Sequence, residues 1–453
     1  MLALSASVSV LVAFNPAQTM TTLAALTLAL LGSPLFIIIA ALAVVSFVGE
    51  GIDPTVVFIE MYRVSDMPAL SAIPLFALTG FLLAESGAAR RLVDMSNALL
   101  GWLPGGLGIV AVVVCALLTA FTGASGMTIV AVGGLLFPAL LRAHYPEGFS
   151  LGLLTTSGSL GLLFPPSIPL ILYGIVSGTS IEDLFVAGIA PGLLLVGLLC
   201  IYCVVIGRRQ RASTSGVVQP AVGLSVDVPA TATAEARPPA WSALREGIWE
   251  LLLPIVVITG IYSGTIAVSE AAALSVLYVL VVEMAVHREI TWRHLPGIIH
   301  RTMVLVGSIF VILAAAMAYT NFMIDAEIPT RLLGYIQLHV SDRLVFLMLL
   351  NIFLLAVGCM IDMFSALIVV VPLVLPIAKG FGIDPVHLGI IFLTNLEIGY
   401  STPPVGLNLF IASARFERPI LSVYRASIPF LLLLLCALLI ITYVPQLSLF
   451  MID

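Results

Sequence analysis

Two Pro-Pro pairs lie within apolar stretches of this chain, and small polar side chains flank each pair. The first half carries SGSLGLLFPPSIPLILY (157–173), and the second half carries NLEIGYSTPPVGLNLF (395–410). A Pro-Pro pair removes two backbone donors and pushes the preceding residue out of helical geometry, so a helix that contains it must break. Carbonyl groups near residues 161–165 and 399–403 therefore lose their helical partners. Free carbonyls and nearby side-chain oxygens together form a dehydrated cation site.

The candidate oxygen donors gather at the two breaks and at two polar segments between short apolar spans. At the breaks the donors are Ser157, Ser159, Ser167, Asn395, Ser401, Thr402 and Asn408. The polar segments offer Thr122, Ser125, Thr128, Asp362 and Ser365. Gly123 and Gly126 allow close backbone approach at the first of these segments. We expect each segment to face the break of its own half.

A single serine in a membrane helix usually bonds its own backbone, so no one hydroxyl carries this prediction. Two breaks with similar polar neighbours do carry it. Asp362 is a stronger signal, because an intramembrane carboxylate costs about 2.5–3.5 kcal/mol on insertion scales. We interpret it as a cation ligand or a proton carrier. Glu397 either does the same work or supports the structure.

The half-helices that follow the Pro-Pro pairs begin near the centre of the apolar stretches. Free N–H groups at a helix N-terminus favour an anionic group. No arginine occurs in either polar segment or in the predicted broken helices. We therefore expect a carboxylate to be held by N–H dipoles, hydroxyl groups and a co-bound cation.

The elements that hold these residues must lie in a membrane. The chain of 453 residues is 61% apolar and only 9% charged, with a mean hydropathy of +1.19. A water-soluble domain carries roughly 25% charged residues, so lipid must cover much of this surface. No GxxxxGK[ST] loop is present, which excludes ATP hydrolysis through a P-loop. The five cysteines stand singly in apolar runs and read as core residues.

The chain contains the same pattern twice. A shift of 238 positions brings Pro138, Gly161, Pro165, Pro166 and Pro191 onto Pro376, Gly399, Pro403, Pro404 and Pro429. Duplicated apolar halves, each with a Gly/Pro-interrupted helix, are typical of secondary transporters.

The predicted fold class is an all-α polytopic membrane protein built from inverted-topology repeats. Each repeat has a re-entrant helical hairpin and a Pro-Pro-broken transmembrane helix, because the paired apolar spans are shorter than the roughly 20 residues a crossing requires. The expected divisions are an N-terminal helical segment (1–68), a first repeat (69–207, hairpin 106–141, broken helix 149–174), a cytoplasmic flexible loop (208–245), a scaffold helix pair (246–302) and a second repeat (303–453, hairpin 344–378, broken helix 388–413).

Basic residues support this topology. With the Arg-rich start of the loop placed in the cytoplasm, only Arg63, Arg331, Arg343 and Lys379 of the 18 basic residues fall outside. The two halves then have opposite orientations. The side of Met1, the role of residues 1–20 and that of the loop stay open.

Six stretches resemble the large membrane subunit of a tripartite ATP-independent periplasmic (TRAP) transporter. They are IPLFALTGFLLAESG (73–87), LPGGLGI (103–109), GASGMT (123–128), FPPSIPLILYGIVSGTSIEDLFVAGIAPGLLL (164–195), SEAAALSVLYVL (269–280) and VPLVLPIAKGFGIDPVHLGIIFLTNLEIGYSTPPVGLNLFIASA (371–414). The resemblance covers roughly residues 20–453. It implies sodium-coupled uptake of carboxylates, an elevator-type movement, a small membrane subunit and a periplasmic substrate-binding protein, all at the bacterial inner membrane.

Carried over by motif, the resemblance implies that Ser125, Ser159, Ser167, Asp362, Asn395, Thr402 and Asn408 take part in the cation sites. The predicted cation ligands are Ser125, Ser159, Pro165, Ser167, Asp362, Ser365, Asn395, Gly399, Thr402 and Asn408. The predicted substrate contacts are Thr122, Gly126, Thr128, Ser157, Pro166, Pro404 and Gly406. Sodium is the expected coupling ion, with H⁺ as the alternative, and neither a cofactor nor a nucleic-acid partner is predicted.

The predicted function is cation-coupled import of small organic acids, such as C4-dicarboxylates or sugar acids, by a translocating subunit that is not an enzyme. One alternative is a stand-alone carboxylate or cation exchanger of the same architecture, without a binding protein. A distant alternative is an intramembrane enzyme that uses Asp362 and Glu397 as paired acids. The sequence leaves the identity of the acid, the stoichiometry and the oligomeric state open.

Overall fold

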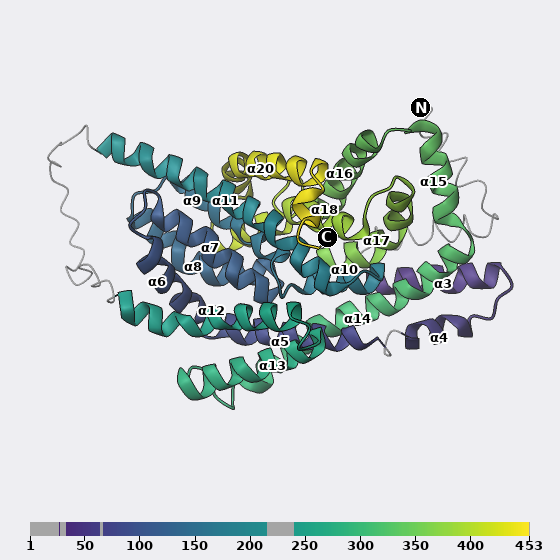
Figure 1. Ribbon diagram of the computed structural model, residues 1–453, viewed down its shortest axis with the longest axis horizontal. Coiled ribbons are helices and arrows are strands. Elements are labelled where there is room, and N and C mark those ends of the chain that lie inside the picture. Colours follow the sequence, from purple (N-terminus) through teal and green to yellow (C-terminus); the bar gives the residue numbers. More distant parts are fainter. Residues whose placement is uncertain (1–26, 28–32, 64–66, 215–239, 453) are drawn as a thin grey trace.

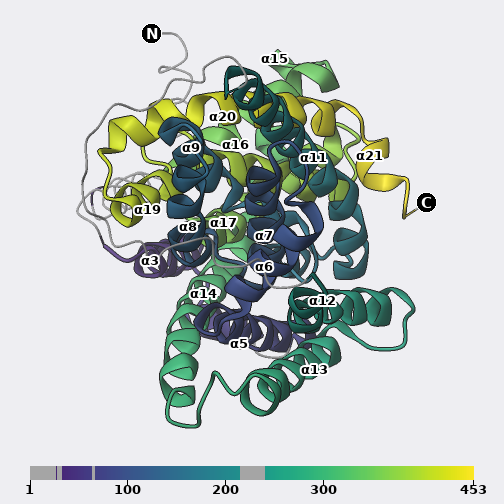
Figure 2. The ribbon, with the colours of Figure 1, turned by 90° about the vertical axis from the view of Figure 1, so that its left-hand side faces the viewer.

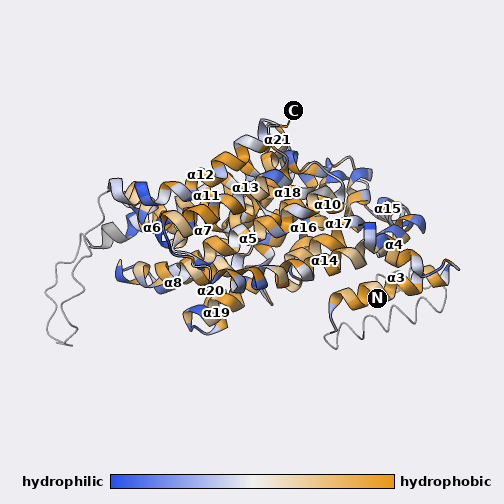
Figure 3. Ribbon diagram, turned by 90° about the horizontal axis from the view of Figure 1, so that it is seen from below, coloured by the Kyte–Doolittle hydropathy of each residue, from blue (hydrophilic) through white to orange (hydrophobic). Residues whose placement is uncertain are grey.

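The computed structural model describes residues 27, 33–63, 67–214 and 240–452. Within these residues every regular element is a helix, as Figure 1 shows. In the part of the chain that the structure describes, seven helices are long and apolar enough to cross a membrane, or up to nine if each bent helix pair is one span. The apolar surfaces of these helices are visible in Figure 3, where polar residues gather at α6 and α15. The predicted all-α polytopic fold is confirmed.

Helices α5, α12, α13 and α14 lie together on one side of the molecule and form part of one layer (Figure 2). Its elements are α3 (Leu35–Gly49), α4 (Thr55–Arg63), the 3₁₀ turn η2 (Pro68–Ser71), α5 (Ala72–Glu85), α12 (Ala240–Tyr262), α13 (Val268–Val281), the π turn η4 (Val282–Val286) and α14 (Leu295–Asp325). In this layer α13 packs on α5, and α14 packs on α3 and α4. Helix α3 begins directly after Pro34, and the predicted segment before it lies mostly outside the described residues.

The first repeat contains the predicted hairpin and broken helix. Its elements are α6 (Ala88–Leu100), the hairpin arms α7 (Gly106–Thr122) and α8 (Ser125–Arg142), the broken helix formed by α9 (Glu147–Ser157), the 3₁₀ turn η3 (Leu160–Leu163) and α10 (Ile168–Ser177), and α11 (Ile181–Thr214). The hairpin turn needs only Gly123, in the left-handed conformation at φ 60°, and Ala124. The broken helix bends by 46° at its Pro-Pro pair.

The second repeat has the same order of elements. They are α15 (Ile328–His339), the hairpin arms α16 (Arg343–Met360) and α17 (Met363–Gly380), the broken helix formed by α18 (Pro385–Gly399) and α19 (Leu407–Phe416), α20 (Ile420–Tyr443) and α21 (Gln446–Leu449). The hairpins lie toward opposite ends of the long axis in Figure 1. Both Pro-Pro bonds are cis.

Helices of one repeat pack against helices of the other, and these contacts occur in symmetric pairs. Helix α10 packs on α17 of the second hairpin, and α19 packs on α8 of the first hairpin. Likewise α9 packs on α20, and α18 packs on α11. Arms α8, α16 and α17 have 18 residues each, so length alone would let them cross a membrane. Each hairpin tip nevertheless lies beside a helix break, as a re-entrant hairpin requires.

Two glycines at equivalent positions allow this close packing. A Cβ atom added at Gly161 would lie 2.4 Å from the Ala120 nitrogen, and one added at Gly399 would lie 2.8 Å from the Gly358 Cα. Residues 120 and 358 are also 238 positions apart. Each break is thus pressed against the first arm of the hairpin in its own repeat.

Helix α6 is joined to α12, to η4 and to the segment after η4 by a buried cluster of charges. The guanidinium of Arg91 lies 2.6 Å from a carboxylate oxygen of each of Glu250, Glu283 and Glu289. Arg91, Glu250 and Glu283 are almost fully buried. We call this group the Arg91 cluster. It fixes α6, which leads into the first hairpin, to the neighbouring layer.

Several predicted boundaries are wrong because hydropathy marks only the apolar part of a helix. The predicted boundary between the scaffold helix pair (246–302) and the second repeat (303–453) falls inside α14, which has 31 residues. The predicted loop 208–245 loses both ends, since α11 continues to Thr214 and α12 begins at Ala240. Arginine is a good helix former, so the Arg-rich start of that segment extends α11. Residues 215–239 lie outside the described part of the chain.

Candidate functional site

The first hairpin tip is held by hydroxyl groups. Thr119 Oγ1 donates to the carbonyl oxygen of Gly158 at 2.8 Å and lies 2.7 Å from Thr128 Oγ1. Ser125 Oγ donates to Asn408 Oδ1 of the opposite repeat at 2.7 Å. The first tip therefore faces the break of its own half, through Gly158, and also contacts the opposite repeat, because α19 packs on α8. Thr122 Oγ1 accepts a long bond from the Ala124 N–H, at 3.4 Å.

The first break is fully buried. Ser159 Oγ lies 3.3 Å from the carbonyl oxygen of Glu397, and Ser167 Oγ donates to the carbonyl oxygen of Leu162 at 2.5 Å. Ser157 is buried, and its Oγ has no hydrogen-bond partner. Pro165 is buried and lines a small pocket beside α11 and α12. Pro166 is buried.

The second broken helix carries a buried amide network. Asn395 Nδ2 donates to Asn351 Oδ1 of α16 at 2.7 Å and to the carbonyl oxygen of Ile391 at 2.8 Å. Asn351 Nδ2 in turn lies 3.1 Å from Thr442 Oγ1 of α20. Asn395 Oδ1 keeps no partner. One predicted ligand is thus oriented by two side chains that the sequence analysis missed.

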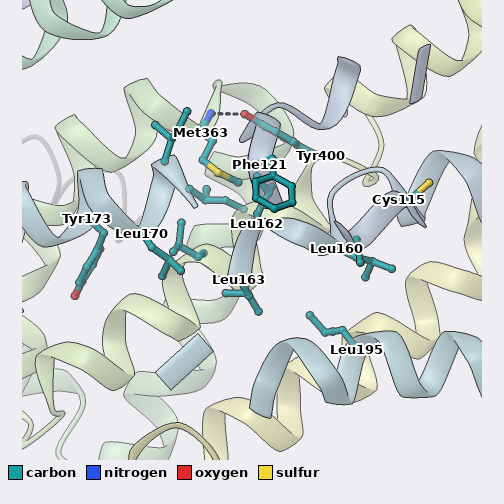
Figure 4. Close-up of a cluster of buried hydrophobic side chains, with 14 of the residues drawn as sticks. Cys115, Phe121, Leu160, Leu162, Leu163, Leu170, Tyr173, Leu195, Met363 and Tyr400 are labelled. Carbon is teal, nitrogen blue, oxygen red and sulfur yellow. Dashed lines mark hydrogen bonds between the residues drawn. The ribbon is translucent and has the colours of Figure 1, made fainter. Parts of the chain in front are cut away.

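The second hairpin tip and the second break are open on one side. Asp362 is exposed and caps α17, since its Oδ2 accepts from the Ser365 N–H at 3.1 Å. The Met363 N–H donates to the Tyr400 hydroxyl, a bond that Figure 4 marks above a floor of apolar side chains that includes Phe121 and Leu162. Pro403, Pro404 and Val405 are exposed as well. The Asp362 carboxylate therefore has a structural role and remains accessible.

The remaining predicted residues surround the same openings. Gly406 has φ 54°, and its N–H donates to the Cys359 carbonyl oxygen at 3.0 Å. Thr402 Oγ1 donates to the Ile398 carbonyl oxygen at 2.8 Å. A Cβ atom on Gly126 would lie 2.6 Å from Ile411 Cδ1, so that glycine permits α8 and α19 to approach.

Buried polar atoms without a hydrogen-bond partner gather at the two broken helices. Of the eleven such atoms in the described part of the chain, six lie here: Ser157 Oγ, Asn395 Oδ1, both carboxylate oxygens of Glu397, Ser401 Oγ and Asn408 Nδ2; four others lie at Arg91, Glu250, Glu283 and His287, and one at Ser427. Residues 157 and 395 are equivalent in the two repeats, 238 positions apart. Buried polar groups are normally paired, so unpaired oxygens at equivalent places call for a ligand. The role of Glu397 stays open between ligand and structural support.

These residues fit a hard cation that prefers neutral oxygen ligands. Hydroxyl, amide and carbonyl oxygens dominate both breaks, and Asp362 supplies a carboxylate. Within the described ranges no group of three or more His, Cys, Asp or Glu side chains is placed to hold a metal ion. The donor set therefore suits an ion such as Na⁺ and does not resemble a transition-metal site.

Basic side chains lie away from both breaks. Helix α19 extends beyond its predicted end and includes Arg415, which corrects the expectation of a broken helix without arginine. Arg415 Nε donates to the Val130 carbonyl oxygen at 3.0 Å, at the far end of α19 from its first residue, Leu407. An anion near the breaks would meet helix N-termini and hydroxyl groups.

The sequence analysis missed Asn351, Thr442, Thr119 and Tyr400. A usable signal existed for Asn351, which is the only strongly polar side chain in the run LVFLMLLNIFLL (344–355). Tyr400 gave no comparable signal, because a tyrosine beside a break is equally suited to packing. Its hydrogen bond to the second hairpin depends on how the hairpin docks.

Known proteins resemble this chain over most of its length. Residues 22–447 match the profile of the family described as "Tripartite ATP-independent periplasmic transporter, DctM component". The C4-dicarboxylate TRAP transporter large permease protein DctM of Pseudomonas aeruginosa is 36% identical over 392 residues, which cover 86% of this chain and 88% of that protein. The ectoine TRAP transporter large permease protein TeaC of Halomonas elongata is 32% identical, over 96% and 99% of the two chains.

Two further matches bear on architecture. The isethionate TRAP transporter permease protein DctMQ of Oleidesulfovibrio alaskensis is 32% identical, over 92% of this chain and 64% of that protein. Among solved structures, the YdaH transporter of Alcanivorax borkumensis superposes with a TM-score of 0.53 at 15% identity, over 84% of this chain and 88% of the other. That likeness concerns the fold alone.

Proposed function

This chain belongs to the DctM component family of tripartite ATP-independent periplasmic transporters. From that premise we propose that it imports small organic acids and that a sodium gradient drives this import. It is a multi-pass protein of the bacterial inner membrane and a transporter permease, not an enzyme. It is the large permease component. Its coupling ion, its substrate and its movement are the parts we propose.

The partners follow from that component role. We propose that a small permease subunit and a periplasmic substrate-binding protein complete the transporter. The relative named DctMQ supports a second permease component, because this chain covers only 64% of its length. The binding protein would deliver the substrate, which agrees with a site built from few charged groups.

The substrate class is a small molecule with an acidic group. Relatives are named for C4-dicarboxylates, ectoine, isethionate and 2,3-diketo-L-gulonate. Among these a carboxylate best suits the helix N-termini of α10 and α19, which begin at Ile168 and Leu407 directly after the breaks. Positive helix ends that point at an anionic group are a recurrent arrangement in secondary transporters.

Sodium coupling rests on one observation above all. Ser157 and Asn395 occupy equivalent positions, both are fully buried, and each keeps an oxygen without a hydrogen-bond partner. Leaving such an oxygen unpaired costs about 1–3 kcal/mol. A bound Na⁺ would remove that cost, since it takes oxygen ligands in place of water. The bound cation would do no more than neutralise charge beside the substrate.

The movement we propose is elevator-like. The hairpins and broken helices interlock, and α3–α5 with α12–α14 form the layer that packs against them. Sliding of one against the other would carry the site across the membrane. Sodium and substrate would bias that equilibrium only through their different affinities for the two states.

The test is thermal unfolding of the detergent-purified protein in NaCl against KCl at constant ionic strength. An ion that binds only the folded form stabilises it by about 2.7 kcal/mol at a hundredfold excess over its Kd. We expect a sodium-specific rise in Tm that Asn395→Ala and Asp362→Ala weaken. Ser308→Ala, an exposed position on α14, is the matched control. Equal curves in both salts for the wild type would refute sodium coupling, and a dependence on pH alone would favour proton coupling.

A further inference from the structure

A surface groove follows the last turns of α13 and lies outside the candidate site. Its volume is about 630 Å³. Leu277 and Val281 are four residues apart in α13, so they share one face of the helix, and Ala285 lines the groove from the π turn η4 that follows. Ile290 also lines the groove, which is therefore an open and mostly apolar surface at the end of a membrane helix.

One end of the groove is polar. Arg288, Thr291 and Trp292 line that end, and all three are exposed. Within the described ranges Arg288 has no hydrogen bond or ion pair. The adjacent carboxylate cannot neutralise it, because Glu289 is held by Arg91 and accepts from the Gly87 N–H at 2.5 Å. The groove therefore has an apolar lining and, at one end, a guanidinium whose charge is not neutralised.

The backbone conformation explains why the side chains of Arg288 and Glu289 point to different places. Arg288 adopts the left-handed conformation at φ 58°, which is uncommon for a residue with a side chain. This turn directs Glu289 toward the Arg91 cluster while Arg288 lies at the groove. A glycine or asparagine would adopt the same conformation at less cost, so the arginine side chain is the feature that needs a reason.

The position of the groove selects its occupant. Val268–Val286 is a candidate membrane span, and the groove runs along its end and into the segment beyond. Leu277 and Val281 are 60% and 52% exposed, as expected for side chains in contact with acyl chains. Trp292, which is 77% exposed, is a residue type that concentrates at headgroup depth. Arg288 then lies where a lipid phosphate would lie.

We propose that this groove binds an anionic phospholipid, with one acyl chain along Leu277, Val281 and Ala285 and the phosphate group at Arg288. The bound lipid holds the segment that contains Arg288, Glu289 and Trp292. Since Glu289 is a member of the Arg91 cluster, lipid binding also stabilises the connection between α13 and α6. The site depends on neither sodium nor the transported acid.

The experiment compares two lipids that differ only in headgroup. The detergent-purified full chain is titrated with phosphatidylglycerol or phosphatidylcholine of identical acyl chains, and bound lipid and Tm are measured. We expect saturable binding of phosphatidylglycerol and a rise in Tm, with at least tenfold weaker binding of phosphatidylcholine. Arg288→Gln should abolish the preference. Arg293→Gln, an exposed arginine of the same segment that does not line the groove, is the matched control and should keep it.

A second variant tests the apolar part. Ala285→Trp fills the groove and should weaken binding of both lipids, whereas Arg288→Gln removes only the headgroup preference. The proposal is overturned if both lipids bind equally to the wild type, or if Arg293→Gln has the same effect as Arg288→Gln. It is also overturned if Ala285→Trp leaves lipid binding unchanged and instead disrupts a complex with another protein chain.

Discussion

Ser159 and Glu397 are 238 residues apart in the chain and meet in the centre of the protein. Ser159 Oγ lies 3.3 Å from the Glu397 carbonyl oxygen. The separation is equal to the repeat offset, so the two residues occupy the same place in the two halves. A contact between equivalent residues lies on the axis that relates the repeats, and both broken helices therefore meet at this point. The candidate site is built around that meeting.

Close packing at the breaks predicts a steric effect of Gly399→Ala. The added Cβ would lie 2.7 Å from the Gly358 carbonyl carbon, and backbone atoms cannot move aside as a side chain can. We expect a loss of about 1–3 kcal/mol of stability, measured as a lower Tm in detergent. Gly297→Ala, where nothing lies within 4 Å, is the control and should not lower Tm. An unchanged Tm for Gly399→Ala would mean that the second hairpin is not docked as described.

The Arg91 cluster predicts a large effect of a single substitution. Arg91→Met removes the only cation between two buried carboxylates, Glu250 and Glu283. Breaking a buried pair in this way costs about 3–5 kcal/mol. Arg90→Met is the matched control, because Arg90 is exposed and lies 4.0 Å from Asp94. Adding Glu250→Gln and Glu283→Gln to Arg91→Met should restore part of the lost Tm, and failure of that rescue would contradict the electrostatic explanation.

The same region predicts a dependence of stability on pH. Burial, and then the nearby charge of Arg91, hold the pKa of His287 below its ordinary value of 6.5. The unfolded chain therefore binds a proton more readily than the folded chain. This contribution to stability is complete above pH 6.5 and is lost as the pH falls through the pKa of the folded state. The Tm should drop on acidification toward about pH 5.

A pair of variants isolates this effect. His287→Gln should flatten the fall in Tm on acidification. His294→Gln, an exposed histidine of the same segment, should leave it unchanged. Glu289 acts in the same direction at lower pH. Burial raises the pKa of Glu289, but hydrogen bonds from Arg91 and Gly87 outweigh it and lower the pKa below 4.5. Equal slopes for wild type and His287→Gln above pH 5 would exclude His287 as the cause.

The contact between Ser125 and Asn408 predicts coupling between the repeats. Their hydrogen bond at 2.7 Å joins the first hairpin tip to the second broken helix. A buried hydrogen bond contributes about 0.5–1.5 kcal/mol. In a double-mutant cycle of Ser125→Ala and Asn408→Ala, the two losses in stability should be non-additive by about that amount. If the bond also shapes the proposed cation site, both variants should weaken the sodium-dependent rise in Tm. Additive losses would show that the two side chains act separately.

The sequence by itself determined the repeat, the two hairpins, the two helix breaks and the membrane setting. These features follow from local chemistry. Proline breaks a helix wherever it stands inside one, and an apolar run partitions into lipid whatever its neighbours are. For that reason the helix breaks at the Pro-Pro pairs and the turns near Ser125 and Asp362 were predicted where the structure has them.

Only the tertiary structure decided which of these groups meet. Asn395 faces Asn351, while Glu397, two residues further along the same helix, contributes its carbonyl oxygen to the contact with Ser159. Ser125 meets Asn408 because α19 crosses onto the opposite hairpin. The Arg91 cluster likewise brings together charged side chains from α6, from α12 and from η4 and the segment after it. Such pairings depend on how two halves of one chain interlock, and no local propensity encodes that geometry.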